Sequence, residues 1–368
     1  MSDVVALTRR LVSIPSHEDE RDAGDAVASW LREETDATVH RDSGGNVIAR
    51  RGDGPRSLAL VGHHDVVPPA DEQVDGDGYV VEERDGRLYG RGTADMKGSL
   101  AAAMVAFRDA AFDERTPAGV DPVDELVFAS FVGEEQGGVG ARAAIDEGFA
   151  PDFAVVGEGS TGYSVPGVTD VAVAHMGRRG STLVASGEGA HASEPEAGDN
   201  AVYRACDAVD IVREMDAPET TVLGQHLDGT VSVTEIEGGS AWNVVPDRCT
   251  VTVDERTVPG ERAPLERTES VEDVEWEVDQ DLPPMACDDA AFADAVLAAA
   301  RESQDGTPER VAKPHATDAG WLAAAGTTCV VCGAAEPGEA HTEHESVSID
   351  VLERCERLYR RAAESLVR

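Results

Sequence analysis

The chain is poor in lysine and has no excess of positive charge to offset its acidic residues. Lys and Arg together number 31 against 72 Asp and Glu, which gives a formal net charge of -41. Such a charge repels nucleic acid and anionic membrane surfaces, so we expect neither as a partner. The acidic residues are spread along the whole chain, which is typical of a halophilic protein. We therefore expect its stability to depend on salt.

Segments that would direct the chain to a membrane are also missing. No cationic stretch precedes an apolar core with a cleavage site, and no apolar run is long enough to span a bilayer. We expect a cytoplasmic protein. Among the six cysteines, Cys329 and Cys332 form the one Cys-x-x-Cys pair, inside the apolar run TTCVVCG. Without a second pair nearby, a buried strand is favoured over a thiolate zinc site or a disulfide framework.

The length of 368 residues predicts two domains. From about residue 3 to 160, helical segments alternate with short apolar runs, which predicts an α/β domain whose mostly parallel sheet is flanked by helices. Alternating strands and one helix near residues 198–214 then predict a small antiparallel α+β sheet. We expect residues 1–176 and 283–368 to form the first domain and residues 177–282 to be inserted in it.

Polar residues follow the apolar runs of the first domain, where ligand crevices of such sheets lie. In LALVGHHD, side chains alternate between two faces, so His63 and Asp65 share one face and His64 points to the other. A carboxylate two residues along the strand can hold a metal-bound imidazole in place. The pattern predicts a role for His63 and Asp65, and it predicts that His64 is expendable.

Two acidic clusters lie farther along the chain. Asp95 stands in the glycine-flanked stretch LYGRGTADMKG, just before an expected helix, where it could also be a simple turn or cap residue. Glu134 and Glu135 end the apolar run ELVFASFVGEE. Adjacent carboxylates repel each other, and this repulsion is tolerable when one binds a cation and the other transfers protons.

Glu158 ends another apolar run, and His341, His344 and Glu345 lie together near the C-terminus. Singly, these residues could be surface groups in solvated loops. Jointly, the clusters supply nitrogen and oxygen ligands without thiolate, which suits a pair of zinc or similar divalent ions. Two neighbouring metals need a bridging carboxylate, for which Asp95 is the natural candidate, and Glu134 then remains as general base.

Two motifs resemble those of the acetylornithine deacetylase / succinyl-diaminopimelate desuccinylase family of zinc amidohydrolases and metallopeptidases. They are Gly62-His63-x-Asp65-Val-Val-Pro68 and the stretch Gly90–Gly98, Gly-Arg-Gly-x-x-Asp-Met-Lys-Gly. Aminoacylases and bacterial glutamate carboxypeptidases also belong to this family. The resemblance runs over nearly the whole chain, with the motifs in the family's order.

The resemblance implies two Zn²⁺ per subunit, with Co²⁺ or Mn²⁺ as substitutes. One ion would be held by His63, Asp95 and Glu158, and the other by Asp95, Glu135 and His341. Glu134 would take the proton of the bridging water and deliver it to the leaving nitrogen. Because the peptide bond after the bridging aspartate is often cis in this family, the resemblance implies a cis bond between Asp95 and Met96.

The inserted segment resembles the family's ferredoxin-like lid domain, a four-stranded sheet with two helices used for dimerisation. By this resemblance, His191 would help to bind the developing oxyanion, across the subunit boundary in dimeric members. Asn243 and Arg256 would recognise a substrate carboxylate, with Arg178 and Thr317, beside Asp318, as weaker candidates. An ordinary surface arginine and a helix cap are the simpler explanations of the last two.

We therefore expect a homodimeric hydrolase that cleaves the amide bond of an N-acyl amino acid, of the acetylornithine deacetylase or succinyl-diaminopimelate desuccinylase type used in amino-acid biosynthesis. Its partner would be a small N-acyl amino acid or a short peptide. The alternatives are a dipeptidase or carboxypeptidase on the same scaffold, and a non-catalytic metal-binding homologue. Glu134 argues against the last, because a mere binder has no need of a free carboxylate beside Glu135.

Overall fold

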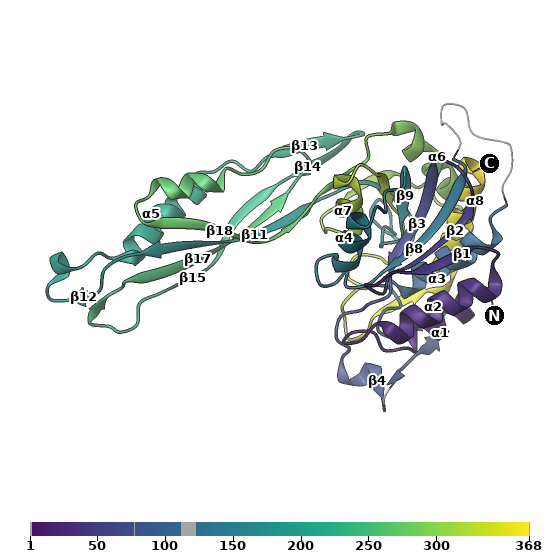
Figure 1. Ribbon diagram of the computed structural model, residues 1–368, viewed down its shortest axis with the longest axis horizontal. Coiled ribbons are helices and arrows are strands. Elements are labelled where there is room, and N and C mark those ends of the chain that lie inside the picture. The colour runs from purple at the N-terminus through teal and green to yellow at the C-terminus, as the bar shows by residue number, and fades with distance from the viewer. Residues whose placement is uncertain (1, 77, 112–122, 368) are drawn as a thin grey trace. The chain divides into compact units, whose positions relative to one another are not determined.

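The computed structural model describes residues 2–76, 78–111 and 123–367. The chain divides into two compact units, each described here by itself (Figure 1). Unit 1 comprises Met1–Ala174, Met285–Lys313 and Thr317–Arg368. Unit 2 comprises His175–Pro284 and Pro314–Ala316. Unit 1 is therefore built from segments that lie on both sides of unit 2 in the sequence.

The main sheet of unit 1 has nine strands within the described residues. Pairing is parallel between β8 and β3, β3 and β9, and β9 and β21, and antiparallel toward both edges. The centre of the sheet is thus parallel, which confirms the expected α/β class. The strand order is β1 (Thr38–Arg41), β2 (Val47–Gly52), β8 (Glu125–Phe131), β3 (Ser57–His63), β9 (Phe153–Val156), β21 (Thr328–Val331), β10 (Val171–His175) and β19 (Met285–Ala286), with β20 (Arg310–Lys313) beside β10.

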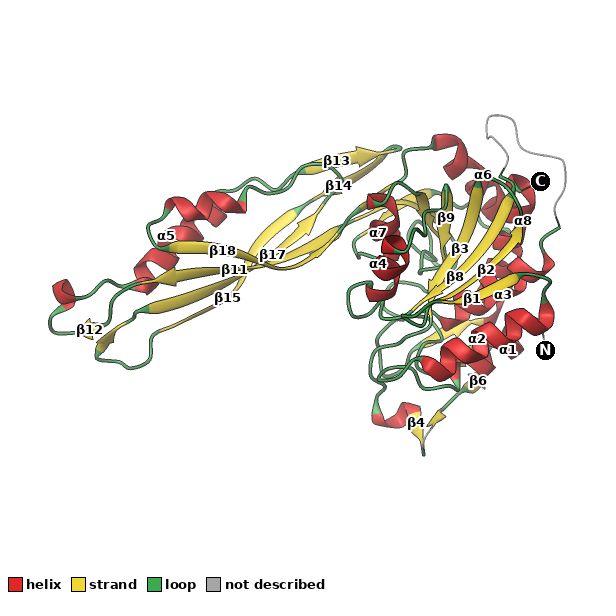
Figure 2. Ribbon diagram, viewed as in Figure 1, coloured by secondary structure: helices red, strands yellow, loops and turns green. Residues whose placement is uncertain are grey.

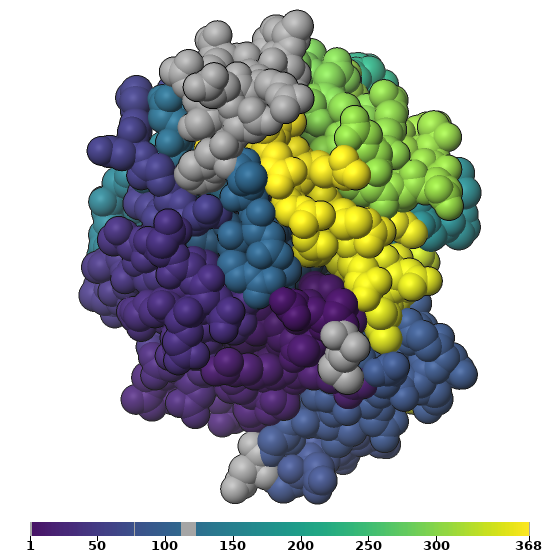
Figure 3. Space-filling view, turned by 90° about the vertical axis from the view of Figure 1, so that its right-hand side faces the viewer, coloured from purple at the N-terminus to yellow at the C-terminus, as the bar shows by residue number. Residues whose placement is uncertain are grey.

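Helices cover both faces of this sheet (Figure 2). On one face lie α4 (Val139–Asp146) and α7 (Asp318–Ala324). The other face carries α1 (Asp3–Val12), α2 (Arg21–Glu34), α3 (Lys97–Asp109), α6 (Ala290–Glu302) and α8 (Ile349–Leu366). Figure 3 shows the C-terminal segment lying against the N-terminal one. Both ends of the chain therefore help to cover one face of the sheet.

Strand β3 alternates between these two faces and is buried throughout. Ala59 and Val61 belong to the apolar cluster beneath α4 and α7, whereas a Cβ on Gly62 would lie 2.5 Å from the Met96 side chain on the opposite face. His64 lies on the same face as Gly62 and is fully buried. Its Nδ1 lies 2.8 Å from Ser130 Oγ, and its Nε2 packs against Gly24 of α2. His64 is therefore a core residue, and its contribution to stability was not predicted from the sequence.

A second, small sheet lies in unit 1. Its strands are β6 (Glu82–Arg84), β7 (Arg87–Tyr89) and β22 (Ser346–Ser348). Pairing of Ser346 with Tyr89 brings a segment from near the C-terminus beside the turn that follows β7. The short elements η1 (Asp71–Gln73), β4 (Val74–Asp75) and β5 (Gly78–Tyr79) precede it.

Unit 2 contains a four-stranded antiparallel sheet in the order β15 (Thr230–Gly238), β17 (Arg248–Thr257), β11 (Gly177–Ser186) and β18 (Val274–Leu282). With helix α5 (Ala201–Arg213) after the first strand, this is the order of a ferredoxin-like fold. The second expected helix is a six-residue 3-10 helix, η3 (Leu265–Ser270). Additional short elements are β12 (Ala190–His191) with β16 (Val244–Val245), β13 (Glu219–Val222) with β14 (Gln225–Asp228), and η2 (Pro195–Ala197).

Two further features concern the chain as a whole. Within the described residues, no helix combines the length and the apolar character needed to cross a membrane. All six cysteines are free thiols, of which Cys206 alone is exposed. Cys329 and Cys332 are buried in and beside β21, as expected for a strand.

Candidate metal centre

Three neighbouring parallel strands deliver acidic and imidazole side chains to one edge of the main sheet. His63 is the last residue of β3. Glu134 and Glu135 follow β8, and Glu158 follows β9. Because the three strands run in the same direction, their carboxyl ends meet at this edge. Loops from elsewhere in unit 1 add Asp95 and His341.

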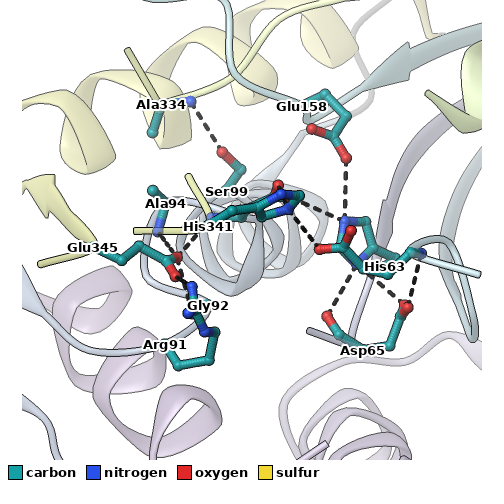
Figure 4. A network of polar contacts seen from close by, with 12 residues as sticks. His63, Asp65, Arg91, Gly92, Ala94, Ser99, Glu158, Ala334, His341 and Glu345 are labelled. Atoms are coloured by element: carbon teal, nitrogen blue, oxygen red, sulfur yellow. Dashed lines mark hydrogen bonds and ion pairs between the residues drawn. The ribbon is translucent and has the colours of Figure 1, made fainter. Parts of the chain in front are cut away.

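These side chains form two groups that share one carboxylate. His63 Nε2 lies 3.2 Å from Asp95 Oδ1 and 3.1 Å from Glu158 Oε1. His341 Nε2 lies 3.0 Å from Asp95 Oδ2 and 3.0 Å from Glu135 Oε1. Asp95 thus presents one oxygen to each imidazole. Figure 4 shows Glu158 and Asp65 on two sides of His63.

The geometry fits a divalent cation better than a proton in each group. An imidazole Nε2–H carries one proton, yet each Nε2 faces two carboxylate oxygens at nearly equal distances. In a tetrahedral shell with metal-ligand distances near 2.0–2.1 Å, neighbouring ligand atoms lie about 3.3 Å apart. The ligand atoms of His63, Asp95 and Glu158 all lie within 4.8 Å of one another, and so do those of Asp95, Glu135 and His341.

Protons compete with such cations for the two imidazoles. Hydrogen bonds to Asp95 and Glu135 raise the pKa of His341 to about 10. Burial alone would lower the pKa of His63, but the charge of Asp65 and hydrogen bonds to carboxylates outweigh it and raise that pKa well above its usual range. An imidazole must be neutral to bind a metal, so affinity for a cation falls as the pH falls.

Asp65 supports His63 from the side opposite the shared carboxylate. His63 Nδ1 lies 3.1 Å from the Asp65 carbonyl oxygen and 3.2 Å from Asp65 Oδ1. A proton on Nδ1 leaves the Nε2 lone pair free for a metal. Asp65 Oδ2 also accepts a hydrogen bond from the Glu135 backbone N–H at 3.0 Å. Asp65 therefore links the orientation of His63 to the loop that carries Glu134 and Glu135.

Among the described residues, Glu134 belongs to neither of the two groups of candidate ligands. Burial raises the pKa of Glu134 well above its usual range, with further increases from the charges of Glu158, Asp318 and Asp95. A raised pKa brings a carboxylate closer to the range in which it can both accept and return a proton near neutral pH. The residue is partly exposed.

Two buried residues near this cluster were missed or undervalued in the sequence. Lys313, at the end of β20, is 5% exposed, and burial lowers its pKa although Glu158, Asp95 and Glu134 oppose the change. Asp318 is also buried, and burial raises its pKa to about 8. Neither Asp318 oxygen has a hydrogen-bond partner among the described residues. The chain contains only two lysines, Lys97 and Lys313, and this scarcity was the signal that could have marked them.

The four residues expected to contact substrate from unit 2 fall into two pairs. Arg178 and Arg256 are directly paired across β11 and β17, and their Nε atoms donate to the two oxygens of Asp254 at 2.6 and 2.8 Å. His191 ends β12 and Asn243 directly precedes β16, where the Ala192 N–H donates to the Asn243 carbonyl oxygen.

The two pairs are far apart within unit 2. Arg178 and Ser186 mark opposite ends of β11, and at about 3.4 Å per residue they are about 27 Å apart. The paired strands β12 and β16, which carry or adjoin His191 and Asn243, lie beyond the Ser186 end of β11, at the tip of unit 2 where Figure 1 labels β12. One subunit therefore cannot bring both pairs to the same small substrate.

The remaining expectations concern three residues of unit 1. Thr317 is the N-cap of α7, with its hydroxyl oxygen accepting the Ala319 N–H, so its role in substrate binding stays a prediction. The Asp95-Met96 peptide bond is cis, as the resemblance implied. Glu345, noted in the sequence only as a member of the C-terminal cluster, is buried against the turn before Asp95.

Comparison with known proteins shows which family the chain matches. Residues 59–365 match peptidase family M20/M25/M40. The chain is 31% identical to a succinyl-diaminopimelate desuccinylase from Bordetella petrii, over 100% of this chain and 98% of that protein. It is also 31% identical to an acetylornithine deacetylase from Myxococcus xanthus, over 86% of this chain and 83% of that protein.

Solved structures share the fold at lower identity. Aminopeptidase PepT from Bacillus cereus has a TM-score of 0.76 at 20% identity, covering 99% of this chain and 98% of that one. The Bacillus subtilis YXEP protein, described as a dinuclear metal-binding peptidase of the M20 family, has a TM-score of 0.67 at 16% identity, covering 98% and 96%. At these identities the likeness establishes the fold alone.

The two adjacent histidines of β3 provide a direct test of the site. We expect His63→Ala to lose one bound metal and nearly all activity, because it removes the imidazole that faces Asp95 and Glu158. We expect His64→Ala to retain both metals but to lower the free energy of unfolding by about 1–3 kcal/mol, through a cavity and an unpaired Ser130 hydroxyl. Mass spectrometry of bound metal and urea unfolding measure the two effects. Loss of metal in His64→Ala would contradict the assignment.

Proposed function

The chain belongs to peptidase family M20/M25/M40, and we propose that it hydrolyses the amide bond of an N-acyl amino acid with two divalent cations, in the manner of an acetylornithine deacetylase or succinyl-diaminopimelate desuccinylase. Family membership confirms the expected class, a hydrolase that cleaves amides. The observation that carries the proposal is the Asp95 carboxylate shared between two imidazole groups, with the uncommitted Glu134 carboxylate beside it.

In this proposal His63, Asp95 and Glu158 hold one Zn²⁺, and Asp95, Glu135 and His341 hold the other, with Co²⁺ or Mn²⁺ as substitutes. When bound, the cations would lower the pKa of a water molecule and polarise the acyl carbonyl group. Glu134 would accept a proton from the attacking water and return it to the leaving nitrogen, a role that its raised pKa favours. Asp65 keeps His63 in the required orientation and tautomer.

Unit 2 would supply the groups that recognise substrate. Arg178 and Arg256 lie side by side and both pair with Asp254. Their two guanidinium groups would together bind a substrate carboxylate. Asn243 would assist this recognition, His191 would stabilise the developing oxyanion, and Thr317 remains a further substrate contact. The separation of the two pairs supports a homodimer in which one pair comes from each subunit.

The surface of unit 2 also supports a homodimer. Among the described residues, this unit exposes five large apolar side chains, and the indole of Trp242 is 97% exposed. The others are Tyr203, Ile236, Val244 and Val278. Exposed apolar groups gathered in one small unit are typical of an association surface. This use of unit 2 as a dimerisation domain, and of unit 1 as the catalytic domain, is part of the proposal.

The net charge of -41 supports one further part of the proposal, adaptation to high salt. We propose a cytoplasmic enzyme adapted to high salt, because mutual repulsion among so many carboxylates opposes the compact state unless ions screen it.

A second candidate is a dipeptidase or carboxypeptidase, since a peptide is itself an N-acyl amino acid. Structural neighbours include human carnosine dipeptidase 1, with a TM-score of 0.68 at 16% identity and coverage of 99% and 95%. A non-catalytic homologue is disfavoured by Glu134, which metal binding alone does not require.

The choice between these functions is tested with a substrate panel. The protein, loaded with zinc or cobalt in high salt, is assayed for release of free amine from N-acetylornithine, N-succinyl-diaminopimelate and a set of dipeptides. We expect N-acetylornithine or N-succinyl-diaminopimelate to give the highest kcat/KM, because the desuccinylase and the deacetylase are 31% identical to this chain, whereas the dipeptidase shares only 16%. Faster hydrolysis of dipeptides would establish the second candidate, and absence of turnover on all substrates would refute both.

Variants of the adjacent residues Glu134 and Glu135 test which glutamate is the base and which is a metal ligand. We expect Glu134→Gln to retain both metals and to lose kcat by at least about 100-fold, because a neutral amide cannot accept the proton. Glu135→Gln serves as the matched variant and is expected to lose metal as well as activity. Metal content and kcat are measured on the same samples. A Glu134→Gln protein with near-normal kcat would rule out Glu134 as the base.

The cross-subunit arrangement is tested by complementation. His191→Ala and Glu134→Gln are each expected to be inactive alone. When the two chains are co-expressed, half of the dimers are hybrids with one intact site, so about a quarter of normal activity should return. Light scattering checks that the protein is a dimer. An active monomer, or an absence of activity in proven hybrids, would contradict the arrangement.

A further inference from the structure

Glu345 makes a set of contacts that the proposed reaction does not use. Its side chain is 0% exposed. One oxygen, Oε1, accepts hydrogen bonds from three backbone N–H groups, those of Gly92, Ala94 and Asp95, at 2.9, 3.0 and 3.1 Å. The other, Oε2, lies 2.5 Å from Arg91 Nη1. Figure 4 shows Glu345 facing Arg91, Gly92 and Ala94.

The turn that donates these bonds has a shape that needs an anion at its centre. Gly90 and Gly92 have φ values of +147° and +87°, and a Cβ on Gly92 would lie 2.7 Å from Val66. Successive backbone N–H groups that converge on one point form an anion-binding concavity. Buried N–H groups left without an acceptor are costly. The Glu345 carboxylate fills this concavity from within the protein.

The clamped turn is the one that presents the shared carboxylate. The Asp95 N–H is one of the three groups bound to Glu345, while the Asp95 side chain lies between His63 and His341. Fixing the backbone of Asp95 therefore fixes the point from which this carboxylate extends.

The same short segment also carries the second imidazole. His341 lies four residues before Glu345, and the Glu345 N–H donates to the Thr342 carbonyl oxygen at 3.3 Å. The Gly90 N–H in turn donates to the Glu345 carbonyl oxygen at 3.1 Å. The segment 341–345 therefore contacts the 91–95 turn through Glu345, and it contacts Asp95 and Glu135 through His341.

We propose that Glu345 is a positioning residue for the metal pair: by clamping the 91–95 turn to the segment that carries His341, it sets the distance between the shared Asp95 carboxylate and the His341 imidazole. This inference rests on the proposed function only in requiring that Asp95 and His341 bind metal. It does not depend on the identity of the substrate. Because Asp95 serves both groups, loosening the turn weakens both sites.

Metal affinity separates this role from a general contribution to folding. Glu345→Gln keeps the size of the side chain but places a neutral amide against Arg91 and the three N–H groups. Glu343→Gln, two residues away and exposed, is the matched control. For each protein, zinc affinity is measured by competition with a chelator, the melting temperature is measured without metal, and kcat and KM are measured at several zinc concentrations.

We expect Glu345→Gln to bind zinc about 10- to 100-fold more weakly, the range found when groups that orient metal ligands are removed. Its kcat should be low at limiting zinc and should recover in part with excess zinc, with KM changed less than about twofold. Glu343→Gln should match the unmodified protein in every measurement. A metal-free Glu345→Gln protein that melts at a lower temperature yet binds zinc with normal affinity would overturn the proposal.

A second variant covers the case in which Glu345→Gln does not fold. Glu345→Asp retains the charge but is shorter by one methylene, so it cannot reach Arg91 and all three N–H groups together. We expect a smaller loss of zinc affinity, still several-fold, and normal affinity in the folded protein would overturn the proposal. Because zinc affinity is read without substrate, a failure of the proposed amide hydrolysis would leave this result interpretable.

Discussion

The Asp95 carboxylate lies between two imidazoles, one oxygen toward each, and the surrounding structure is arranged around this contact. Glu134, Glu135, Glu158, Asp65 and Asp318 gather nearby, at least partly buried, and repel one another. Burial and mutual charge raise the pKa values of Glu134 and Glu135. Such a concentration of negative charge is tolerable when cations are bound within it. The proposed cations would offset this repulsion.

The scaffold reduces that cost by distributing the ligands over several rigid elements. His63, Glu135 and Glu158 extend from the ends of neighbouring parallel strands, whose spacing is set by backbone hydrogen bonds. Asp95 and His341 come from loops, which lack such a constraint. Their positions are set instead by Glu345, whose carboxylate satisfies the backbone of one loop while belonging to the other. Three of the candidate ligands therefore depend on strand ends and the turns that follow them, and the other two depend on one buried anion.

The scarcity of lysine has a structural counterpart. Arginine carries nearly all of the positive charge of the chain, and the two lysines, Lys97 and Lys313, are both buried in unit 1. Lys97 donates to the Ile14 carbonyl oxygen at 2.7 Å. A guanidinium presents five donors in a fixed plane, whereas an ammonium is compact and is satisfied by fewer partners. Both lysines therefore lie in buried positions close to carboxylates of the cluster.

Local pattern in the sequence was sufficient for the α/β class, for the alternation that separates His63 from His64, and for the identity of the polar residues at the strand ends. These features depend on periodicity over a few residues, which the backbone imposes wherever a strand forms. Other features depend on contacts between residues that are far apart along the chain, or on the register of paired strands. They are the sharing of Asp95 between two imidazoles, the clamp by Glu345, the burial of His64 and Lys313, and the separation of Arg256 from Asn243. Such contacts are decided only when distant segments pack together, because side-chain distances follow from tertiary packing and not from spacing along the chain.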